Sequence, residues 1–595
     1  MKKGLLLFLL MVSVALSKAA PVVLIEQGGW LESSYVTWQK TSGLTYHVYI
    51  SPASTESWTK LDDELVREYT DYGRADALGL QAGAYQFKIV PVNNGTEVAS
   101  DAAVSPIIDV KAYNREGFAH KQAGTMGIGA YNNDGTLKPE ARVIYVWGGN
   151  AKTISLKVKK DKKGTEATYA GLQNIINGYQ KGDDNGSYDQ RPLCVRIIGT
   201  IRDTDMDSFG SSEEGLQIKG AKEYQKMHIT IEGVGNDATI WGFGFLLRNS
   251  ASVELRNFGI MLCMDDCVSI DTKNEMIWVH NLDFFYGKTG SASDQKKGDG
   301  TLDIKGHSHW CTFSYNHFWD SGKSSLGGMK NESTTDYNTY HHNWFDHSDS
   351  RHPRIRTMSM HIYNNYFDGN SKYGVGMTYG GSAFVEQNYF RHCKYPMLIS
   401  KQGTDAKGSG TFSGENGGVI KSYGNVVINA QSLVTYQQNP SSWDCWEAGE
   451  RNAQVPTNVL AKAGGTGYNN FDTDASIMYD YTPDAANDVP DILTGTYGAG
   501  RMQHGDFQWT FNNATEDTND EVIPQLKTAL ENYQSPWVGF FSGTTAIREI
   551  TTDTSKGGPL YDLQGRQISL PKSANIYIQN GHKRIYKCSG VLSCS

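Results

Sequence analysis

Cysteine is scarce in this chain of 595 residues, and its eight cysteines are scattered between Cys194 and Cys594. Such a sparse distribution excludes a small disulfide-dense scaffold, and the lack of any C-x-x-C pair argues against a structural zinc site. We therefore expect most of these cysteines to be buried thiols. A bridge between Cys588 and Cys594 stays open, because spacing alone cannot show disulfide pairing.

Long apolar runs are lacking after the first 20 residues, which argues against a helical membrane span in the rest of the chain. In residues 1–19, Lys2 and Lys3 precede the apolar run GLLLFLLMVSVAL, and small residues lie close behind it. This pattern is typical of a cleaved secretion signal. The alternative is a membrane anchor, but the run is shorter than the ~20 residues that a span needs. We expect secretion to the periplasm, the cell surface or the medium.

An excess of positive charge is also lacking, because the formal net charge is −9, and this argues against a nucleic-acid partner. The chain is instead rich in residues of turns and sugar contacts, with 64 Gly, 33 Tyr and 13 Trp. This composition favours turn-rich β structure. The length exceeds what one hydrophobic core usually serves, so we expect more than one domain. We also expect a monomer.

Two small β-rich segments flank a longer central region. Residues 21–112 alternate apolar and polar residues in SYVTWQK, TYHVYIS and AYQFKIVPV, which predicts a β-sandwich. It resembles a fibronectin type III module, which implies either a spacer or a unit that binds carbohydrate or a partner. Residues 545–595 are predicted to form a short β-rich tail. Its YDLQGRQ motif resembles the C-terminal tails of secreted Gram-negative proteins, so we expect a sorting or attachment module or a plain terminal unit.

Helical periodicity is absent from the central region, residues 115–540, where short apolar strands recur beside an asparagine. These asparagines are Asn257, Asn281, Asn316, Asn343, Asn365, Asn388 and Asn425. Their separations of roughly 22 to 37 residues are typical of a strand-built repeat with inserted loops. We predict an all-β chain whose centre is a right-handed parallel β-helix with an asparagine ladder. A sandwich is the other alternative, and propeller blades need longer repeats of ~40 residues.

The candidate site residues recur at about one coil, so a β-helix would stack them on one face. They are Asp265 and Asp266 in CMDDCVSID, Asp299 and Asp303 in KGDGTLDIKG, Lys323 in DSGKSSLGG, and Arg351, Arg354 and Arg356 in SRHPRIR. Asp299 and Asp303 would lie ~13 Å apart in a straight strand, but Gly300 allows a turn between them. With Asp266 they could supply oxygen ligands to calcium. Ordinary aspartates in β-helix turns fit the spacing equally well.

The ordered motifs of this region resemble the core of polysaccharide lyase family 1, the pectate lyases. They are RPLCVRIIGTI, ITIEGVGNDATIWGFGF, VELRNFGI, DGTLDI, YNHFWDSGKSSLGG, YHHNWFD, RHPRIR and HIYNNYF, over roughly residues 117–440. The combination of D-G-x-x-D-I, G-K-x-x-L-G-G and R-x-P-x-x-R is much more specific than any one of its parts. YTPDAANDVPDILTGTYGAG is also similar to the segment that closes the β-helix in these enzymes.

The resemblance implies a role for each matching residue. The calcium ligands would be Asp266, Asp299 and Asp303, with Asp265 as a further candidate. Some family members have an additional carboxylate where this chain has Met264, so the number of ions stays open. Lys323 would be catalytic and contact the substrate carboxylate, Arg351 would be the general base, and Arg356 would position the substrate.

The implied reaction is calcium-dependent β-elimination on α-1,4-linked polygalacturonate, the unesterified form of pectin, which gives 4,5-unsaturated oligogalacturonides. An arginine is normally charged because its ordinary pKa lies above 12, so an arginine base predicts an alkaline pH optimum. The alternatives are a pectin lyase, a polygalacturonase on the same fold, and a non-catalytic pectin-binding protein. The polygalacturonase pattern is incomplete, because residues 306–308 read GHS in place of GHG and no NTD precedes the aspartate pair.

Overall fold

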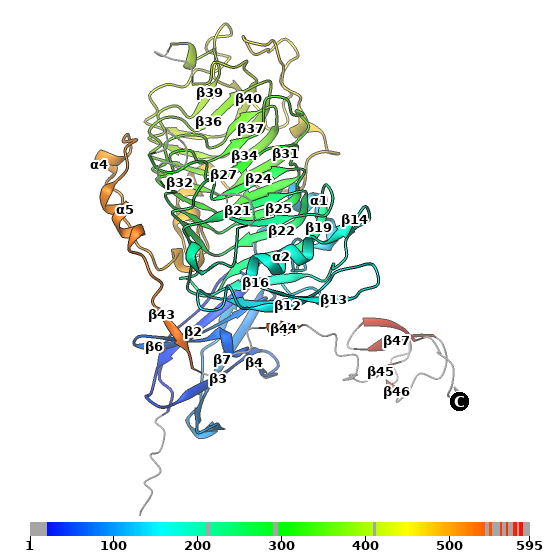
Figure 1. The fold of residues 1–595 in the computed structure, drawn as a ribbon. Helices are drawn as coiled ribbons and strands as arrows, with labels where there is room; N and C mark the ends of the chain where they lie inside the picture. The colour runs from blue at the N-terminus through cyan, green and yellow to red at the C-terminus, as the bar shows by residue number, and fades with distance from the viewer. Residues whose placement is uncertain are drawn as a thin grey trace, which may run out of the picture.

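The computed structural model describes residues 21–209, 215–288, 296–407, 412–541 and 547–549, and the backbone of 560–561, 567–568, 575–579 and 582–586. A tall stack of parallel strands forms most of the molecule, and the N-terminal strands lie at its lower end (Figure 1). The predicted signal at residues 1–19, Cys588 and Cys594 lie outside the described residues.

Three parallel sheets form a right-handed β-helix across the central region, which confirms the predicted fold class. The eight-stranded sheet contains β18 (Gly215–Lys219), β21 (Gly244–Arg248), β24 (Val268–Thr272), β27 (Leu302–Ile304), β30 (Leu326–Gly327), β33 (Arg354–Arg356), β36 (Val375–Thr378) and β39 (Met397–Ile399). The nine-stranded sheet contains β17 (Thr200–Arg202), β20 (Thr239–Trp241), β23 (Gly259–Met261), β26 (Asp283–Phe284), β29 (His317–Trp319), β32 (Trp344–Asp346), β35 (Tyr366–Asp368), β38 (Tyr389–Arg391) and β41 (Val426–Ile428).

The twelve-stranded sheet forms the third face of the β-helix, and antiparallel β44 adds to its first strand. Its strands are β11 (Arg142–Val146), β16 (Leu193–Ile197), β19 (Gln225–Gly233), β22 (Ser250–Arg256), β25 (Glu275–His280), β28 (Cys311–Ser314), β31 (Tyr337–His341), β34 (Ser359–Tyr363), β37 (Ser382–Glu386), β40 (Val419–Tyr423), β42 (Trp446–Glu447) and β44 (Ile547–Glu549).

An asparagine ladder ties successive coils together at one corner. The side-chain amides of Asn316, Asn343, Asn365 and Asn388 each donate to the next asparagine, ending at Asn425, at 2.9 to 3.0 Å. The prediction is confirmed for these five residues. It is wrong for Asn257 and Asn281, which lie in the left-handed conformation at φ 59° and 49° and bond to backbone carbonyls instead. Asparagine suits both places because it tolerates left-handed backbone.

A column of phenylalanines fills the interior behind the nine-stranded sheet. Ring centroids of consecutive members lie 4.1 to 5.2 Å apart through Phe284, Phe318, Phe345, Phe367 and Phe390. This repeat matches the ~4.8 Å distance between neighbouring strands. The identical side chain on each coil therefore stabilises the same register that the backbone requires.

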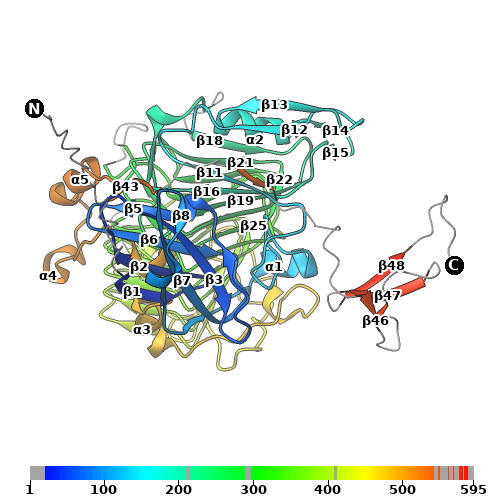
Figure 2. The same ribbon diagram turned by 90° about the horizontal axis from the view of Figure 1, so that it is seen from below.

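The N-terminal residues form two antiparallel sheets that pack across the end of the β-helix (Figure 2). One sheet contains β1 (Leu24–Gly29), β2 (Ser33–Gln39), β5 (Val66–Tyr69), β6 (Tyr72–Leu78) and β43 (Trp537–Phe540). The other contains β3 (Thr45–Pro52), β4 (Thr59–Lys60), β7 (Gly83–Asn93), β8 (Thr96–Glu97), β9 (Ala103–Val104) and β10 (Ile108–Val110). These two sheets confirm the predicted β structure of this region, while its likeness to fibronectin type III stays a prediction.

The N-terminal sheets share both a core and buried charges with the β-helix. Trp38 and Phe87 belong to the same apolar cluster as Tyr145 of the β-helix. Arg67 pairs with Asp76 of its own sheet and, at 3.2 Å, with Asp237 of the β-helix. Because leaving one partner of a buried pair alone is strongly destabilising, this contact fixes the N-terminal sheets in place.

The remaining elements are short. The helices are α1 (Phe118–Ala123), α2 (Leu172–Gln180), α3 (Val489–Thr494), α4 (Asn513–Glu516) and α5 (Pro524–Glu531). Two hairpins are β12 (Ser155–Lys159) with β13 (Glu166–Ala170), and β14 (Gly182–Asp183) with β15 (Gly186–Ser187). The tail contributes an antiparallel sheet of β45 (Leu560–Tyr561), β46 (Gln567–Ile568), β47 (Asn575–Gln579) and β48 (His582–Tyr586). Within the described ranges, none of the helices combines the length and apolarity needed to cross a bilayer.

Candidate active site

Four neighbouring strands of the eight-stranded sheet carry the candidate residues at the same end. Asp265 and Asp266 precede β24, Asp299 precedes β27, Lys323 precedes β30 and Arg351 precedes β33. Backbone bonds join these rungs: Val268 N donates to Thr301 O at 2.9 Å, Thr301 N to Lys323 O at 3.0 Å, and Ser325 N to Arg351 O at 2.7 Å. Residues far apart in the sequence are therefore separated by single rungs.

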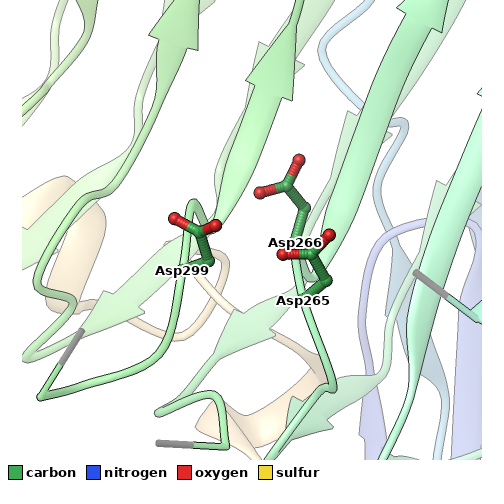
Figure 3. A group of neighbouring side chains, drawn as sticks. All are labelled: Asp265, Asp266 and Asp299. Carbon is green, nitrogen blue, oxygen red and sulfur yellow. The ribbon is translucent and has the colours of Figure 1, made fainter. Parts of the chain in front are cut away.

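Three carboxylates meet at the lower rungs of this site. Carboxylate oxygens of Asp265, Asp266 and Asp299 lie within 4.8 Å of one another, and Figure 3 shows them reaching toward one another from two adjacent segments. Calcium takes oxygen ligands at about 2.3–2.6 Å, so oxygens this close can share one ion. The structure thus groups Asp265, the further candidate, with two of the three predicted ligands.

Asp303, the remaining predicted ligand, lies beside this cluster. Its Oδ1 accepts a hydrogen bond from Leu326 N at 2.8 Å. A Cβ at Gly300 would lie 2.6 Å from Asp303 Oδ2 and 2.7 Å from Asp266 Oδ1. A glycine is therefore required where these two carboxylates approach the backbone.

Burial makes this concentration of negative charge unfavourable without a compensating cation. Burial, followed by the charge of Asp303, raises the pKa of Asp266 well above its ordinary value. Burial also raises the pKa of Asp303, although the charges of Lys305 and Arg351 oppose the shift. Lys305 Nζ lies 3.5 Å from Asp266 Oδ2. A divalent ion would favour the charged carboxylates, and an all-oxygen donor set suits calcium better than zinc.

The cations lie on the next rungs. Lys323 Nζ is 3.9 Å from Asp299 Oδ1. Arg351 is half-buried at φ 63°. Across the described part of the chain, no ion pair or side-chain hydrogen bond involves its guanidinium. This arginine is therefore available to an incoming group, in contrast to the two that follow it.

Glu415 holds the two other arginines of the cluster, and sequence reasoning missed it. Arg356 donates from Nε at 3.2 Å and from Nη2 at 3.1 Å to the two carboxylate oxygens of Glu415. Arg354 donates from Nη2 to the same carboxylate at 3.2 Å. Burial and the charges of Arg356 and Arg351 lower the pKa of Arg354, although Glu415 opposes this. No motif surrounds Glu415, so only its fold-imposed contact could have revealed it.

Lys297 is a second residue that sequence reasoning missed. Its side chain is 1% exposed, and its Nζ lies 2.5 Å from Asp320 Oδ1 and 2.8 Å from Asp349 Oδ1. Asp320 precedes Lys323 by three residues and Asp349 precedes Arg351 by two. One buried ammonium group therefore ties together the two segments that present the candidate cations.

Cavities are also found elsewhere in the described structure. One of about 350 Å³ is lined by Tyr113, Trp278, Tyr315 and Tyr497, between the N-terminal sheets and the twelve-stranded sheet. None of the carboxylates or cations described above lines it. The candidate site is instead made of side chains stacked on successive strands of the eight-stranded sheet.

The family model described as pectate lyase matches residues 194–467. Pectate lyase 3 of Pectobacterium carotovorum subsp. carotovorum is 27% identical over 370 residues, which cover 60% of this chain and 90% of that protein. Pectate trisaccharide-lyase of Bacillus licheniformis is 28% identical over 213 residues, 35% of this chain, and the chain spans only 58% of that relative.

A solved structure of similar fold is the pectate lyase of Bacillus sp. N165 in complex with trigalacturonate. It is 20% identical, covers 65% of this chain and 99% of that one, and has a TM-score of 0.43. Residues 194–467 are thus similar to pectate lyases, and this chain has further β-sheets before that region.

Replacing the buried lysine tests whether Lys297 is essential to this arrangement. We expect Lys297→Met to lower the free energy of unfolding by about 3 kcal/mol, because Asp320 and Asp349 would remain buried without their partner. Denaturant unfolding followed by circular dichroism measures this. The neighbouring Lys296→Met is the matched control, since Lys296 forms an exposed pair with Glu521 and such pairs contribute little. Equal stabilities of the two variants would contradict the assigned role.

Proposed function

We propose that this chain, which contains a pectate lyase family region, is a pectate lyase that cleaves α-1,4-linked polygalacturonate by calcium-dependent β-elimination. The products would be 4,5-unsaturated oligogalacturonides. The observation that supports this most directly is the order of groups on successive rungs: a carboxylate cluster, then Lys323, then the unpaired guanidinium of Arg351. In this reaction, cations must bind the uronate carboxylate while a base beside them removes the neighbouring C5 proton.

Asp265, Asp266 and Asp299 would hold the calcium ion, with Asp303 as the alternative third carboxylate. Calcium, when bound, supplies positive charge that neutralises the C6 carboxylate and favours loss of the C5 proton. Lys323 would donate a hydrogen bond to the same carboxylate and hold the sugar in register. Its 3.9 Å distance from Asp299 keeps this ammonium next to the carboxylate cluster.

Arg351 would remove the proton from C5. The electron pair left at C5 forms the C4–C5 double bond as the C4–O bond breaks, and the leaving oxygen then takes up a proton. Arg351 suits this role because its guanidinium forms no ion pair or side-chain hydrogen bond with the described residues, whereas Glu415 already binds Arg354 and Arg356. Arg356 would therefore position substrate through the donors that Glu415 leaves unused.

The regions outside the β-helix complete this proposal. The N-terminal sheets would be a fibronectin type III-like module, and residues 1–19 a signal that directs secretion. Their fixed contact with the β-helix through Arg67 and Asp237 favours a structural role over that of a loose spacer. A monomer would suffice, because all the groups named above come from one chain.

An assay of the purified protein on polygalacturonate tests the reaction class. We expect ultraviolet absorbance from unsaturated uronates to increase, to increase faster at alkaline pH, and to stop when a calcium chelator is added. Restoring calcium should restore the rate. New reducing ends without this absorbance would indicate a hydrolase and contradict the proposal. Binding without either product would leave only a pectin-binding protein.

Replacing Arg351 with lysine tests whether the guanidine group itself, and not only its positive charge, is needed. We expect Arg351→Lys to lower kcat by at least a hundredfold, within the range that a positioned base contributes, because the lysine keeps the charge but not the guanidine. Arg354→Lys is the matched control from the same segment and should retain most of the turnover. Similar losses in both variants would mean that the segment acts only through its overall charge.

Removal of one ligand tests the calcium site without relying on turnover. We expect Asp299→Asn to raise the calcium dissociation constant at least tenfold in isothermal titration calorimetry, since ligand charge sets calcium affinity. Asp488→Asn, an exposed position before α3, provides the same charge change as a control. An unchanged dissociation constant in Asp299→Asn would remove this residue from the ligand set.

A further inference from the structure

Two buried thiols meet at the base of the loop that carries Asp265 and Asp266. The loop joins β23 to β24, and it begins at Cys263 and ends at Cys267. Both cysteines are 1% exposed, and their Sγ atoms lie 2.7 Å apart. Among the six cysteines of the described residues, this is the only pair whose sulfur atoms are in contact. The three intervening residues are Met264, Asp265 and Asp266.

Neighbouring rungs hold both ends of this loop. Lys288 N donates to Cys263 O at 2.8 Å, Cys267 N donates to Gly300 O at 3.3 Å, and Phe245 N donates to Cys267 O at 2.9 Å. The backbone is therefore fixed on each side of the thiols, and both sulfurs lie in the main apolar core. A bonded sulfur pair is ~2.05 Å apart, so a displacement of under ~1 Å would join them.

We propose that Cys263 and Cys267 form a disulfide that closes this loop and holds Asp265 and Asp266 in place for calcium. The second half of this statement rests on the proposed function, whereas the bond itself does not. The oxidant is a disulfide compound of the oxidising compartment into which the predicted signal would direct the chain. Since both thiols are buried in the folded protein, the exchange takes place while the coil is still forming.

The exchange balances in two steps. One cysteine thiolate attacks the oxidant disulfide, forming a mixed disulfide and releasing one oxidant thiol. The second thiolate attacks the cysteine sulfur of that mixed disulfide, which forms the Cys263–Cys267 bond and releases the other oxidant thiol. The protein loses two protons and two electrons, and the oxidant disulfide is reduced to two thiols.

The expected effect on calcium follows from restricted loop motion. With the bond closed, the loop has fewer conformations in which its carboxylates point apart, so less ordering is needed when the ion binds. With the bond open, only non-covalent contacts hold the loop, such as the backbone bonds of Cys263 and Cys267 and the hydrogen bond from Cys263 Sγ to Asp265 O at 3.2 Å. We expect calcium affinity to be about threefold to tenfold lower in the reduced protein.

Peptide mapping tests the bond directly. The full chain is secreted or refolded in the presence of oxidised glutathione, alkylated in denaturant without reductant, and digested with trypsin. Both cysteines fall in one peptide, residues 257–273, because no lysine or arginine lies between Arg256 and Lys273. We expect this peptide to carry no alkyl group and to weigh two hydrogens less than the reduced form. A peptide with two alkyl groups overturns the proposal.

Calcium titration tests the consequence and separates the two hypotheses. The same preparation is measured by calorimetry before and after reduction, together with Cys263→Ala/Cys267→Ala. Cys393→Ala is the control, because Cys393 is buried between β38 and β39, at the same corner of a later coil, and has no sulfur in contact. A closed bond with equal affinities overturns the role in calcium binding. If the bond is closed but the protein shows neither lyase activity nor calcium binding, the proposed function is refuted and the disulfide is confirmed. If the protein is an active lyase but both thiols are alkylated, the disulfide is refuted and the proposed function is retained.

Discussion

Parallel backbone pairing between consecutive coils is the constraint on which this molecule depends. Each coil places the same corner ~4.8 Å above the previous one, so a strand of the eight-stranded sheet can only carry its side chains at a height set by its neighbours. The stretch from Asp265 to Arg351 is thereby folded into four rungs. The hydrogen bonds of the asparagine ladder and the ring contacts of the phenylalanine column stabilise the same register. The chemistry of the site follows from this stacking without any long, specialised loop.

Some charged side chains on these rungs have a full ion-pair partner and others do not, and this difference distinguishes structural from functional groups. Arg354 and Arg356 are matched by Glu415, and Asp320 and Asp349 are matched by Lys297. Lys305 lies 3.5 Å from Asp266 and Lys323 lies 3.9 Å from Asp299, whereas Arg351 forms no ion pair within the described chain and adds its charge near Asp303. Groups that structure alone needs are therefore paired, while incompletely compensated groups gather at one end of one sheet. Perturbed and unpaired charges of this kind are typical of functional sites.

Much of the architecture could be predicted from the sequence, because the β-helix repeats one corner many times. This repeat predicted the ladder from Asn316 to Asn425 correctly, but it wrongly included Asn257 and Asn281. Spacing of 22 to 37 residues cannot distinguish a ladder position from the left-handed residue one place earlier, since asparagine suits both.

The candidate site was predictable to the level of rungs but not of side-chain direction. The motifs placed Asp266, Asp299, Lys323 and Arg351 on adjacent coils, as observed. They did not show that Asp265 joins the carboxylate cluster while Asp303 bonds to Leu326, because this depends on how the chain turns at Gly300. Glu415 was missed because it reaches the site from a segment outside the motifs. Lys297 begins the stretch KGDGTLDIKG, but its partners Asp320 and Asp349 lie on later rungs. Contacts between distant segments leave no spacing pattern in the sequence.

The pairing of β43 with an N-terminal strand has a consequence for the order in which the protein folds during synthesis. It pairs with β5, so one edge of an N-terminal sheet is completed by Trp537–Phe540. At ~5–20 residues per second, a ribosome needs roughly half a minute to a minute and a half to travel from one of these strands to the other. During that time the edge of β5 is open and can be occupied by a chaperone or by a neighbouring nascent chain. The N-terminal sheet that contains β5 is therefore completed only after Trp537–Phe540 has been synthesised.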